Sequence, residues 1–172
     1  QAELFLNGKS LGISSKTKNG TPQERYRLMW MDVKYELGTL KVVALNEDGN
    51  PVAEEVVKTD GKPHQLVLKP VTKTLKANGE DLAFVEVSVV DKNGIPCPTA
   101  TNQLQFEVTG NGKFRAACNG DATSLEQFHL PSMKLFSGKL IVIVQTTNEA
   151  GSIDLKVSAE GLQSETITLQ SR

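Results

Sequence analysis

The sequence is poor in most of the residues that carry chemistry. Aromatic residues make up 5% of its 172 residues, and it holds two cysteines, two histidines and one tryptophan. A small scaffold held together by disulfides would contain more cysteines. The longest purely apolar run, Leu140–Val144, is far too short to span a bilayer. We therefore expect neither a disulfide framework nor insertion into a membrane.

Strong charge of either sign is also missing. Nineteen Lys and Arg residues balance twenty Asp and Glu residues, which leaves a net charge of −1. The basic residues are scattered along the chain, whereas proteins that bind nucleic acid or anionic lipid gather them in patches. We therefore expect no nucleic-acid partner. No charged-then-apolar leader opens the sequence, so we expect any export signal either to lie outside it or not to exist.

Metal-binding patterns are absent from the sequence. The only histidines are His64 and His129, and no C-x-x-C or H-x-x-x-H spacing occurs. Asn119-Gly120-Asp121 could offer oxygens to Ca²⁺, but it lacks the spaced acids of a calcium loop and is better read as a turn. We predict no metal and no cofactor. Cys97 and Cys118 are interpreted as two separate thiols, with a bridge between them as the alternative.

Catalytic patterns are equally weak. Asp121, Ser124 and His129 could be drawn as a triad, but no G-x-S-x-G motif presents the serine. Acid-based hydrolysis needs two carboxyl groups held across a cleft in different environments. The acidic residues fall instead in turns or on polar strand faces, as in Glu54-Glu55 and Glu80-Asp81. We therefore predict no catalytic residue.

Turns are what the sequence has in abundance. Eight of its fourteen glycines follow Asn or Asp. Asn and Gly adopt positive φ at little cost, so such pairs mark tight turns between strands. The first of them lies in Glu3–Gly12, where Leu4 and Leu6 share one face and Glu3, Phe5 and Asn7 the other, before the turn at Asn7-Gly8. The protein is therefore expected to be built of β-hairpins.

Alternating apolar and polar residues between the turns predict an all-β protein. No window shows apolar residues at i, i+3, i+4 and i+7 with caps, so no helix is expected. The clearest strand is Leu82–Val90, and Lys139–Thr147 resembles a strand buried on both faces. The other expected strands include Leu28–Tyr35, Leu40–Asn46, Val52–Thr59, His64–Lys69, Thr72–Ala77, Leu104–Val108, Phe114–Cys118, Ser152–Ala159 and Glu165–Leu169.

Both halves of the chain close with a turn glycine followed by an alternating strand. The first closing strand is His64–Lys69, so we place the domain boundary just after it, giving domains 1–69 and 70–172. The second has the size and strand rhythm of an immunoglobulin-like β-sandwich. The first is short for a full sandwich, which would leave it marginally stable with an exposed sheet edge.

Three aromatic residues in the first half are weak candidates for a sugar-binding platform. Tyr26, Trp30 and Tyr35 could form a row of flat rings for pyranose stacking. A pleated strand buries one of its faces, however, so Trp30 is more simply interpreted as a core residue.

Taken together, these phrases resemble the C-terminal accessory region of family 2 glycoside hydrolases of the β-galactosidase type, in the form common among Bacteroides-like bacteria. The resemblance covers nearly the whole chain in matching order. It is carried by ELFLNGKSLG (Glu3–Gly12), W-x-x-V-x-Y (Trp30, Val33, Tyr35), GTLKVVAL (Gly38–Leu45), T-x-G-x-P (Thr59, Gly61, Pro63), LKANGEDLAFVEVSVVDKNG (Leu75–Gly94), the stretch Pro98–Asn102, F-x-V-x-G-x-G (Phe106–Gly112), CNGD (Cys118–Asp121) and F-S-G-K (Phe136–Lys139).

The resemblance implies a non-catalytic role. In this family the catalytic glutamates belong to a TIM barrel upstream of these domains, and no segment here matches the barrel. It implies two consecutive immunoglobulin-like sandwich domains, the first truncated because a further strand normally precedes Glu3–Gly12. The implied partners are the barrel and other domains of the parent chain, carbohydrate, and a second copy through an exposed sheet edge.

The parent implied by the resemblance hydrolyses terminal β-galactosides and is expected to be exported, to the periplasm or the cell surface. The alternative from another functional class is a glycan- or surface-binding adhesion module, suggested by the immunoglobulin-like rhythm together with Trp30 and Tyr35.

Overall fold

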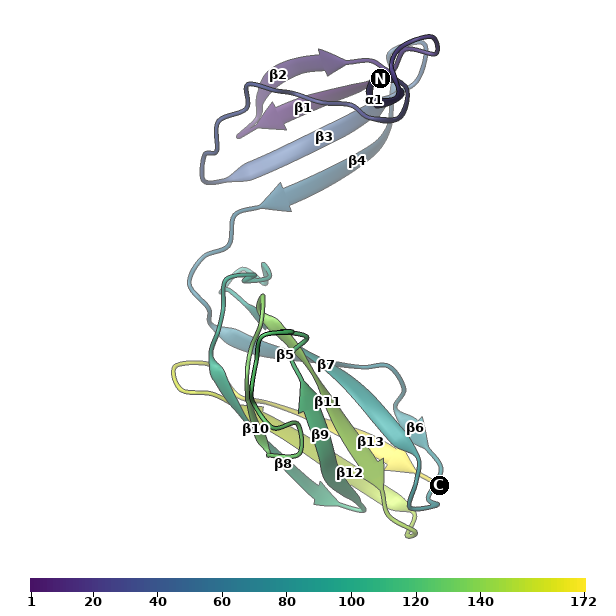
Figure 1. The fold of residues 1–172 in the computed structure, drawn as a ribbon, viewed down its shortest axis with the longest axis vertical. Coiled ribbons are helices and arrows are strands. Elements are labelled where there is room, and N and C mark those ends of the chain that lie inside the picture. Colours follow the sequence, from purple (N-terminus) through teal and green to yellow (C-terminus); the bar gives the residue numbers. More distant parts are fainter. The chain divides into compact units, whose positions relative to one another are not determined.

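The computed structural model describes residues 1–172 and is nearly all β, as the sequence predicts (Figure 1). The chain divides into two compact units, the first unit at Gln1–Thr59 and the second unit at Asp60–Arg172. None of its helices has the length and apolar character needed to cross a membrane.

The first unit contains one antiparallel sheet of four strands in the order β2-β1-β3-β4. The strands are β1 (Ala2–Leu6), β2 (Lys9–Ser14), β3 (Thr39–Leu45) and β4 (Pro51–Lys58). β1 and β2 are joined at Asn7-Gly8, where φ is 51° and 81°. The Asn7 amide also links this turn to the start of β3, since its Oδ1 accepts from the Thr39 N–H at 2.9 Å. The predicted hairpin is therefore confirmed.

The segment between β2 and β3 differs from prediction in two ways. Leu28–Tyr35 forms no strand, although its residues alternate. A short helix, α1 (Pro22–Tyr26), forms where none was expected. Its start is a capping box, in which Thr21 accepts from the Glu24 N–H and the Glu24 carboxylate accepts from the Thr21 N–H. Because α1 has only five residues, it is too short to show an i, i+4, i+7 pattern.

The exposed sheet edge expected of the first unit does not lie beside β1. β1 pairs with β2 on one side and with β3 on the other, so it lies inside the sheet. The edges are β2 and β4, and every residue of β4 is exposed. The first unit thus holds a single sheet rather than the two layers of a sandwich.

The second unit contains two sheets with a shared core. One has five strands in the order β10-β8-β12-β13-β6, and the other has four in the order β5-β7-β11-β9. All pairs are antiparallel except β13 with β6. The strands are β5 (Gln65–Pro70), β6 (Thr74–Leu75), β7 (Leu82–Val90), β8 (Gln103–Gly110), β9 (Gly112–Cys118), β10 (Ser132–Lys134), β11 (Lys139–Thr146), β12 (Gly151–Ser158) and β13 (Glu165–Ser171).

The core of the second unit follows the predicted alternation. In β7, Ala83, Val85, Val87 and Val89 all point inward and are at most 1% exposed. β11 pairs with β7 through Leu140↔Val87 and Val142↔Val85, and its other face is only half-buried. Residues from both sheets form one cluster of twenty buried apolar side chains. The second unit is therefore a β-sandwich.

The unit boundary lies ten residues before the predicted one. His64–Lys69 was expected to close the first domain, but β5 covers this stretch and pairs with β7 of the second unit. The two units divide between Thr59 and Asp60. The prediction was wrong because alternation identifies a strand without indicating which strand it pairs with.

Candidate functional site

The three aromatic candidates have different environments. Tyr26 ends α1 and is 69% exposed, with the Arg25 guanidinium 5.3 Å from its ring centre. Tyr35 is 79% exposed. Trp30 is half-buried, and its indole N–H donates to the Gly12 carbonyl at 3.0 Å. Trp30 is thus held against β2, while both tyrosines face solvent.

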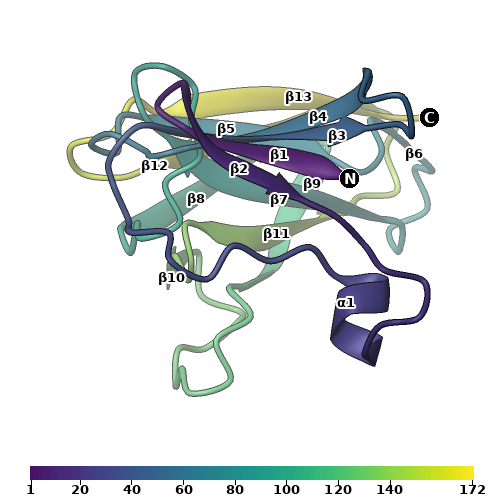
Figure 2. The same cartoon turned by 90° about the horizontal axis from the view of Figure 1, so that it is seen from above.

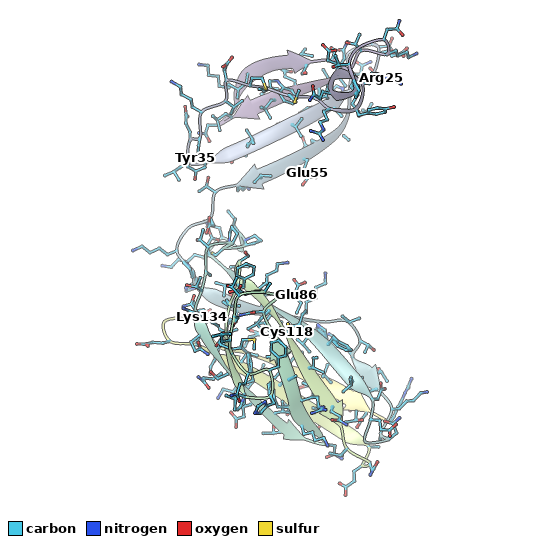
Figure 3. All side chains as sticks on the ribbon, viewed as in Figure 1. Arg25, Tyr35, Glu55, Glu86, Cys118 and Lys134 are labelled. Carbon is cyan, nitrogen blue, oxygen red and sulfur yellow. The ribbon has the colours of Figure 1, made fainter.

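The structure does not bring these rings into one row. Arg25, the neighbour of Tyr26, and Tyr35 lie at opposite ends of the first unit in Figure 3. A flat platform for several sugar units would need adjacent rings. Sugar binding therefore stays a hypothesis for each exposed tyrosine separately.

A small apolar hollow lies beside Trp30. It measures about 220 Å³ and is lined by Leu11 of β2 together with Trp30, Met31, Asp32 and Val33. Four of these five side chains are apolar, and Asp32 is the only acid among them. The hollow is better suited to an apolar side chain than to a sugar, because it offers few hydrogen-bonding groups.

Asp91 is a buried carboxylate with three backbone donors, and sequence reasoning missed it. Its Oδ1 accepts from the Asn93 and Ile95 N–H groups at 2.8 and 2.9 Å, and its Oδ2 accepts from the Gly61 N–H at 2.8 Å. Only 3% of Asp91 is exposed. The bond from Ile95, followed by those from Gly61 and Asn93, holds the pKa of Asp91 below its ordinary value against the opposing effect of burial.

A second hollow of about 450 Å³ lies over Asp91. Its lining consists of Gly61, Lys62, Pro63, His64, Asp91, Lys92 and Asn93. The carboxylate of Asp91 is already bonded to three backbone N–H groups, so it serves to join the loop at Gly61 to the turn after β7. We therefore interpret Asp91 as a structural residue.

The residues that could be drawn as a triad have other partners. Both the N–H and the hydroxyl of Thr123 donate to Asp121, and Ser124 donates its hydroxyl to Glu126. Neither Asp121 nor Ser124 is hydrogen-bonded to His129. Asp121 and Glu126 instead brace the long loop before β10, where the Glu126 carboxylate accepts from the Lys134 N–H at 3.0 Å.

The carboxyl groups with shifted pKa values all shift downward. The Thr21 N–H and hydroxyl lower the pKa of Glu24, and the Thr123 hydroxyl and N–H lower that of Asp121. Backbone hydrogen bonds likewise lower the pKa of Asp91. A general acid in glycoside hydrolysis needs the opposite shift, so that it still carries its proton near neutral pH. These three groups therefore act as caps of local structure.

The two cysteines are separate free thiols, in agreement with the favoured interpretation. Cys97 is buried, whereas Cys118 is exposed at the end of β9. Burial, together with the carboxylate of Asp60, raises the pKa of the Cys97 thiol to about 11. Cys97 is therefore an unreactive core residue. No group of three or more His, Cys, Asp or Glu side chains is placed to hold a metal ion.

Comparison with known families matches both parts of the chain. Residues 66–168, more than half of the chain, match the family described as "Glycoside hydrolase family 2 C-terminal domain 5". Residues 1–53 match a family described as "Domain of unknown function (DUF4982)". The two matches fall in the second and first units respectively.

Individual relatives extend the similarity to nearly the whole chain. Beta-galactosidase BoGH2A from Bacteroides ovatus is 40% identical over 163 residues, which is 95% of this chain and 18% of that protein. A beta-glucuronidase from Formosa agariphila is 27% identical over 98% of this chain and 17% of its own length. The chain thus spans about a fifth of the length of these relatives.

Solved structures show a similar fold. A family 2 glycosyl hydrolase from Bacteroides cellulosilyticus gives a TM-score of 0.89 at 27% identity, over 99% of this chain and 21% of that one. A beta-glycosidase from Bacteroides vulgatus gives a TM-score of 0.86 at 30% identity, over 98% and 21%.

Proposed function

Because this chain belongs to the glycoside hydrolase family 2 C-terminal domains, we propose that it is a non-catalytic accessory region of a β-galactosidase-like enzyme, here called the parent polypeptide. The parent polypeptide hydrolyses terminal β-galactosides. The observation that carries this proposal is the 40% identity to a beta-galactosidase over 95% of the chain, confined to 18% of that relative.

The environment of the acidic side chains supports a non-catalytic role. Asp91 and Asp121 accept hydrogen bonds from backbone N–H groups within two to four residues, which keeps them ionised and fixed in turns. Glu24 does the same at the start of α1. A retaining glycosidase instead needs two carboxyl groups about 5–5.5 Å apart, one of them protonated.

The role that fits this structure is that of a scaffold beside the catalytic domain. The second unit is a sandwich with a continuous core of twenty buried side chains, which makes it a rigid body on its own. The first unit buries only Ala2, Leu4 and Val43 among its apolar side chains and leaves eleven large apolar side chains exposed. We therefore assign anchoring to the second unit and contact with other parts of the parent polypeptide to the first.

Hydrolysis of a chromogenic β-galactoside tests the proposal. Residues 1–172 should give no saturable hydrolysis, whereas the parent polypeptide should give saturable kinetics. Saturable hydrolysis by residues 1–172 alone would overturn the non-catalytic assignment. A parent polypeptide that hydrolyses other glycosides but no β-galactoside would overturn the assignment of β-galactosides as its substrate.

An adhesion module that binds glycans is the second candidate, favoured by the exposure of Tyr26 and Tyr35. Titration of residues 1–172 with galactosides distinguishes the two proposals. Saturable binding that is lost in Tyr35→Ala or Tyr26→Ala would support the adhesion module, and flat titrations would remove it.

We also propose that a second copy of the chain can pair with the open edge of β4. All eight residues of β4 are exposed, and Val52 and Val57 are 63% and 62% exposed. An open strand edge with apolar side chains favours pairing with another strand. A sedimentation series of residues 1–172 tests this, since a concentration-independent monomer would exclude a second copy there.

A further inference from the structure

Six of the turns in this protein contain an Asn-Gly pair. Such a pair is chemically labile, because glycine has no Cβ to shield its backbone nitrogen from the preceding side chain. For the amide to be lost, the asparagine side chain must be free to turn its Cγ toward that nitrogen. The backbone must also be free to bring the two atoms together. The six pairs are Asn7-Gly8, Asn19-Gly20, Asn78-Gly79, Asn93-Gly94, Asn111-Gly112 and Asn119-Gly120.

The side-chain amides of four of these asparagines are already hydrogen-bonded. Asn111 is an example, since its Nδ2 donates to the carbonyls of Glu149 and Ala150 at 3.2 and 2.9 Å. Turning its Cγ toward the next backbone nitrogen would break both bonds, so the fold protects this pair. The other three are protected in the same way, by Leu37 and Thr39 at Asn7, by Glu80 and Asp81 at Asn78, and by Lys134 and Asp121 at Asn119.

Asn93-Gly94 is protected through its backbone. The Asn93 N–H donates to Oδ1 of Asp91 at 2.8 Å. The Gly94 N–H, which belongs to the nitrogen that would attack, donates to the Asp91 carbonyl at 3.1 Å. Asp91 is itself buried and also accepts from the N–H groups of Gly61 and Ile95. Freeing the Gly94 nitrogen would therefore disturb a turn that is anchored in the second unit.

Asn19-Gly20 has neither kind of restraint. The Asn19 side-chain amide makes no hydrogen bond to another residue, and Asn19 is exposed. The Gly20 N–H donates to the Thr17 carbonyl at 3.2 Å, but no residue from 15 to 27 is buried. Figure 2 shows that α1 and the loop leading into it project away from the sheet of the first unit. Opening the turn from Thr17 to Gly20 therefore breaks no contact with a buried core.

We propose that Asn19 is a site of spontaneous deamidation and that it reacts before the other five Asn-Gly pairs. The Gly20 backbone nitrogen bonds to Cγ of Asn19 while the Cγ–Nδ2 bond breaks, and the proton of the Gly20 N–H leaves with Nδ2 as ammonia. Water then opens the cyclic imide. Opening on the Cγ side gives aspartate, and opening on the other side gives isoaspartate, in which the chain continues through the side-chain carboxyl group. The reaction needs only this fold and water, so it is independent of the proposed function.

The modification acts on the start of α1. Gly20 directly precedes Thr21, whose N–H and hydroxyl donate to the Glu24 carboxylate at 2.7 and 2.9 Å. Isoaspartate adds one CH₂ to the backbone between residues 19 and 20, which displaces Gly20 from the Thr17 carbonyl and shifts Thr21. Because α1 has five residues and none of them is buried, it depends on this cap. We therefore expect α1 to unravel in the isoaspartate product.

Ageing residues 1–172 at mildly alkaline pH, followed by peptide mass spectrometry, tests the proposal. The peptide that contains Asn19 should gain the mass of an NH₂-to-OH exchange at least roughly tenfold faster than peptides with the other five pairs, because its reaction requires no opening of packed structure. In denaturant this difference should disappear, which provides the internal reference. Equal rates in the folded protein, or faster reaction at another pair, would overturn the proposal.

Asn19→Gln with Asn93→Gln as its control identifies the reacting residue. Glutamine keeps the amide but is one CH₂ longer, so the same ring cannot close. Both positions are exposed, so neither change should unfold residues 1–172. Asn19→Gln should abolish the fast mass gain, and Asn93→Gln should leave it unchanged. A fast mass gain that survives Asn19→Gln would place the reaction at another residue and overturn the proposal.

Asn19→Asp separates the two products of the reaction, because it reproduces aspartate without isoaspartate. Amide NMR signals of α1 should keep their positions in Asn19→Asp and move to positions typical of an unfolded segment in the isoaspartate fraction of aged protein. Signals of β1 and β3 should stay the same in both and report that the sheet is intact. Unchanged α1 signals in the isoaspartate fraction would overturn the predicted effect on α1.

Discussion

The carboxylate of Asp91 and the backbone N–H of Gly61 meet at 2.8 Å although thirty residues separate them in the sequence. Gly61 lies at the start of the second unit, and Asp91 follows β7, the strand that pairs with both β5 and β11. The same carboxylate caps the turn to Ile95 through its other oxygen. Asp91 therefore ties the entry of the chain into the second unit to the centre of its four-stranded sheet.

Replacing Asp91 with Asn should destabilise the second unit. Both oxygens accept backbone N–H groups, so an amide in this place would turn one acceptor into a donor facing another donor. We expect the thermal midpoint of the second unit to fall by several degrees, measured by calorimetry. Asp154→Asn is the control, because Asp154 accepts only from the Thr168 hydroxyl at an exposed site. Equal effects of the two variants would contradict this role of Asp91.

The same bonds predict how stability depends on pH. The folded state lowers the pKa of Asp91 below its ordinary 3.8, so its stabilisation is complete above the unfolded pKa and is lost as the pH falls through the folded one. The difference in unfolding free energy between wild type and Asp91→Asn should be constant near neutral pH and shrink below about pH 4. A difference that stays constant down to pH 3 would show that the charge of Asp91 does not matter.

Local features of this fold were predictable, and features that depend on pairing were not. Asn7-Gly8 and the alternation of β7 are determined by backbone preference and by one buried face, both of which the sequence displays. Leu28–Tyr35 alternates equally well but forms no strand, because a strand also needs a backbone partner within about 4.8 Å. The assignment of β5 failed for the same reason, since its partner β7 follows it in the sequence.

In the candidate site, too, the local features were predictable from the sequence and the tertiary contacts were not. Asn93-Gly94 is one of the pairs that predict a turn, and Asp91 does accept from the Asn93 N–H within that turn. Its bond to Gly61 arises only from the tertiary fold and leaves no local signal. The row of Tyr26, Trp30 and Tyr35 rests on residue type alone. In the structure Tyr26 ends α1, and an irregular segment separates it from Tyr35.

Amides of the first unit should exchange with solvent faster than those of the second. The first unit buries three apolar side chains and the second buries twenty, so local opening costs less free energy in the first. In residues 1–172 we expect amides of β1 and β3 to exchange at least roughly tenfold faster than those of β7 and β11. Uniform protection across both units, measured by mass spectrometry, would contradict this.

The two thiols should react very differently. Cys118 is exposed, whereas Cys97 is buried with its pKa raised to about 11, so little thiolate forms at Cys97 near pH 8. Titration of native protein with a thiol-specific chromogenic disulfide should detect one thiol, and titration in denaturant should detect two. Cys118→Ser should abolish the native signal. A native signal that survives Cys118→Ser would mean that Cys97 is accessible.

Two glycines with similar backbone angles should respond differently to the same substitution. Gly110 and Gly94 have φ values of 80° and 76°, so alanine is strained at both. A Cβ on Gly94 would meet nothing within 4 Å, whereas one on Gly110 would clash with the Ser152 carbonyl oxygen of β12. Gly94→Ala should therefore cost only the left-handed backbone term, about 1–2 kcal/mol.

Gly110→Ala should cost clearly more, because the β8 end must move away from β12 or lose its pairing there, at Ile153↔Gly110. Urea unfolding of both variants measures the two costs on the same second unit, so the difference between them isolates the steric contact from backbone strain. Equal losses of unfolding free energy in the two variants would mean that β8 and β12 separate at Gly110 without cost. The close approach of their backbones would then add nothing to the stability of the second unit.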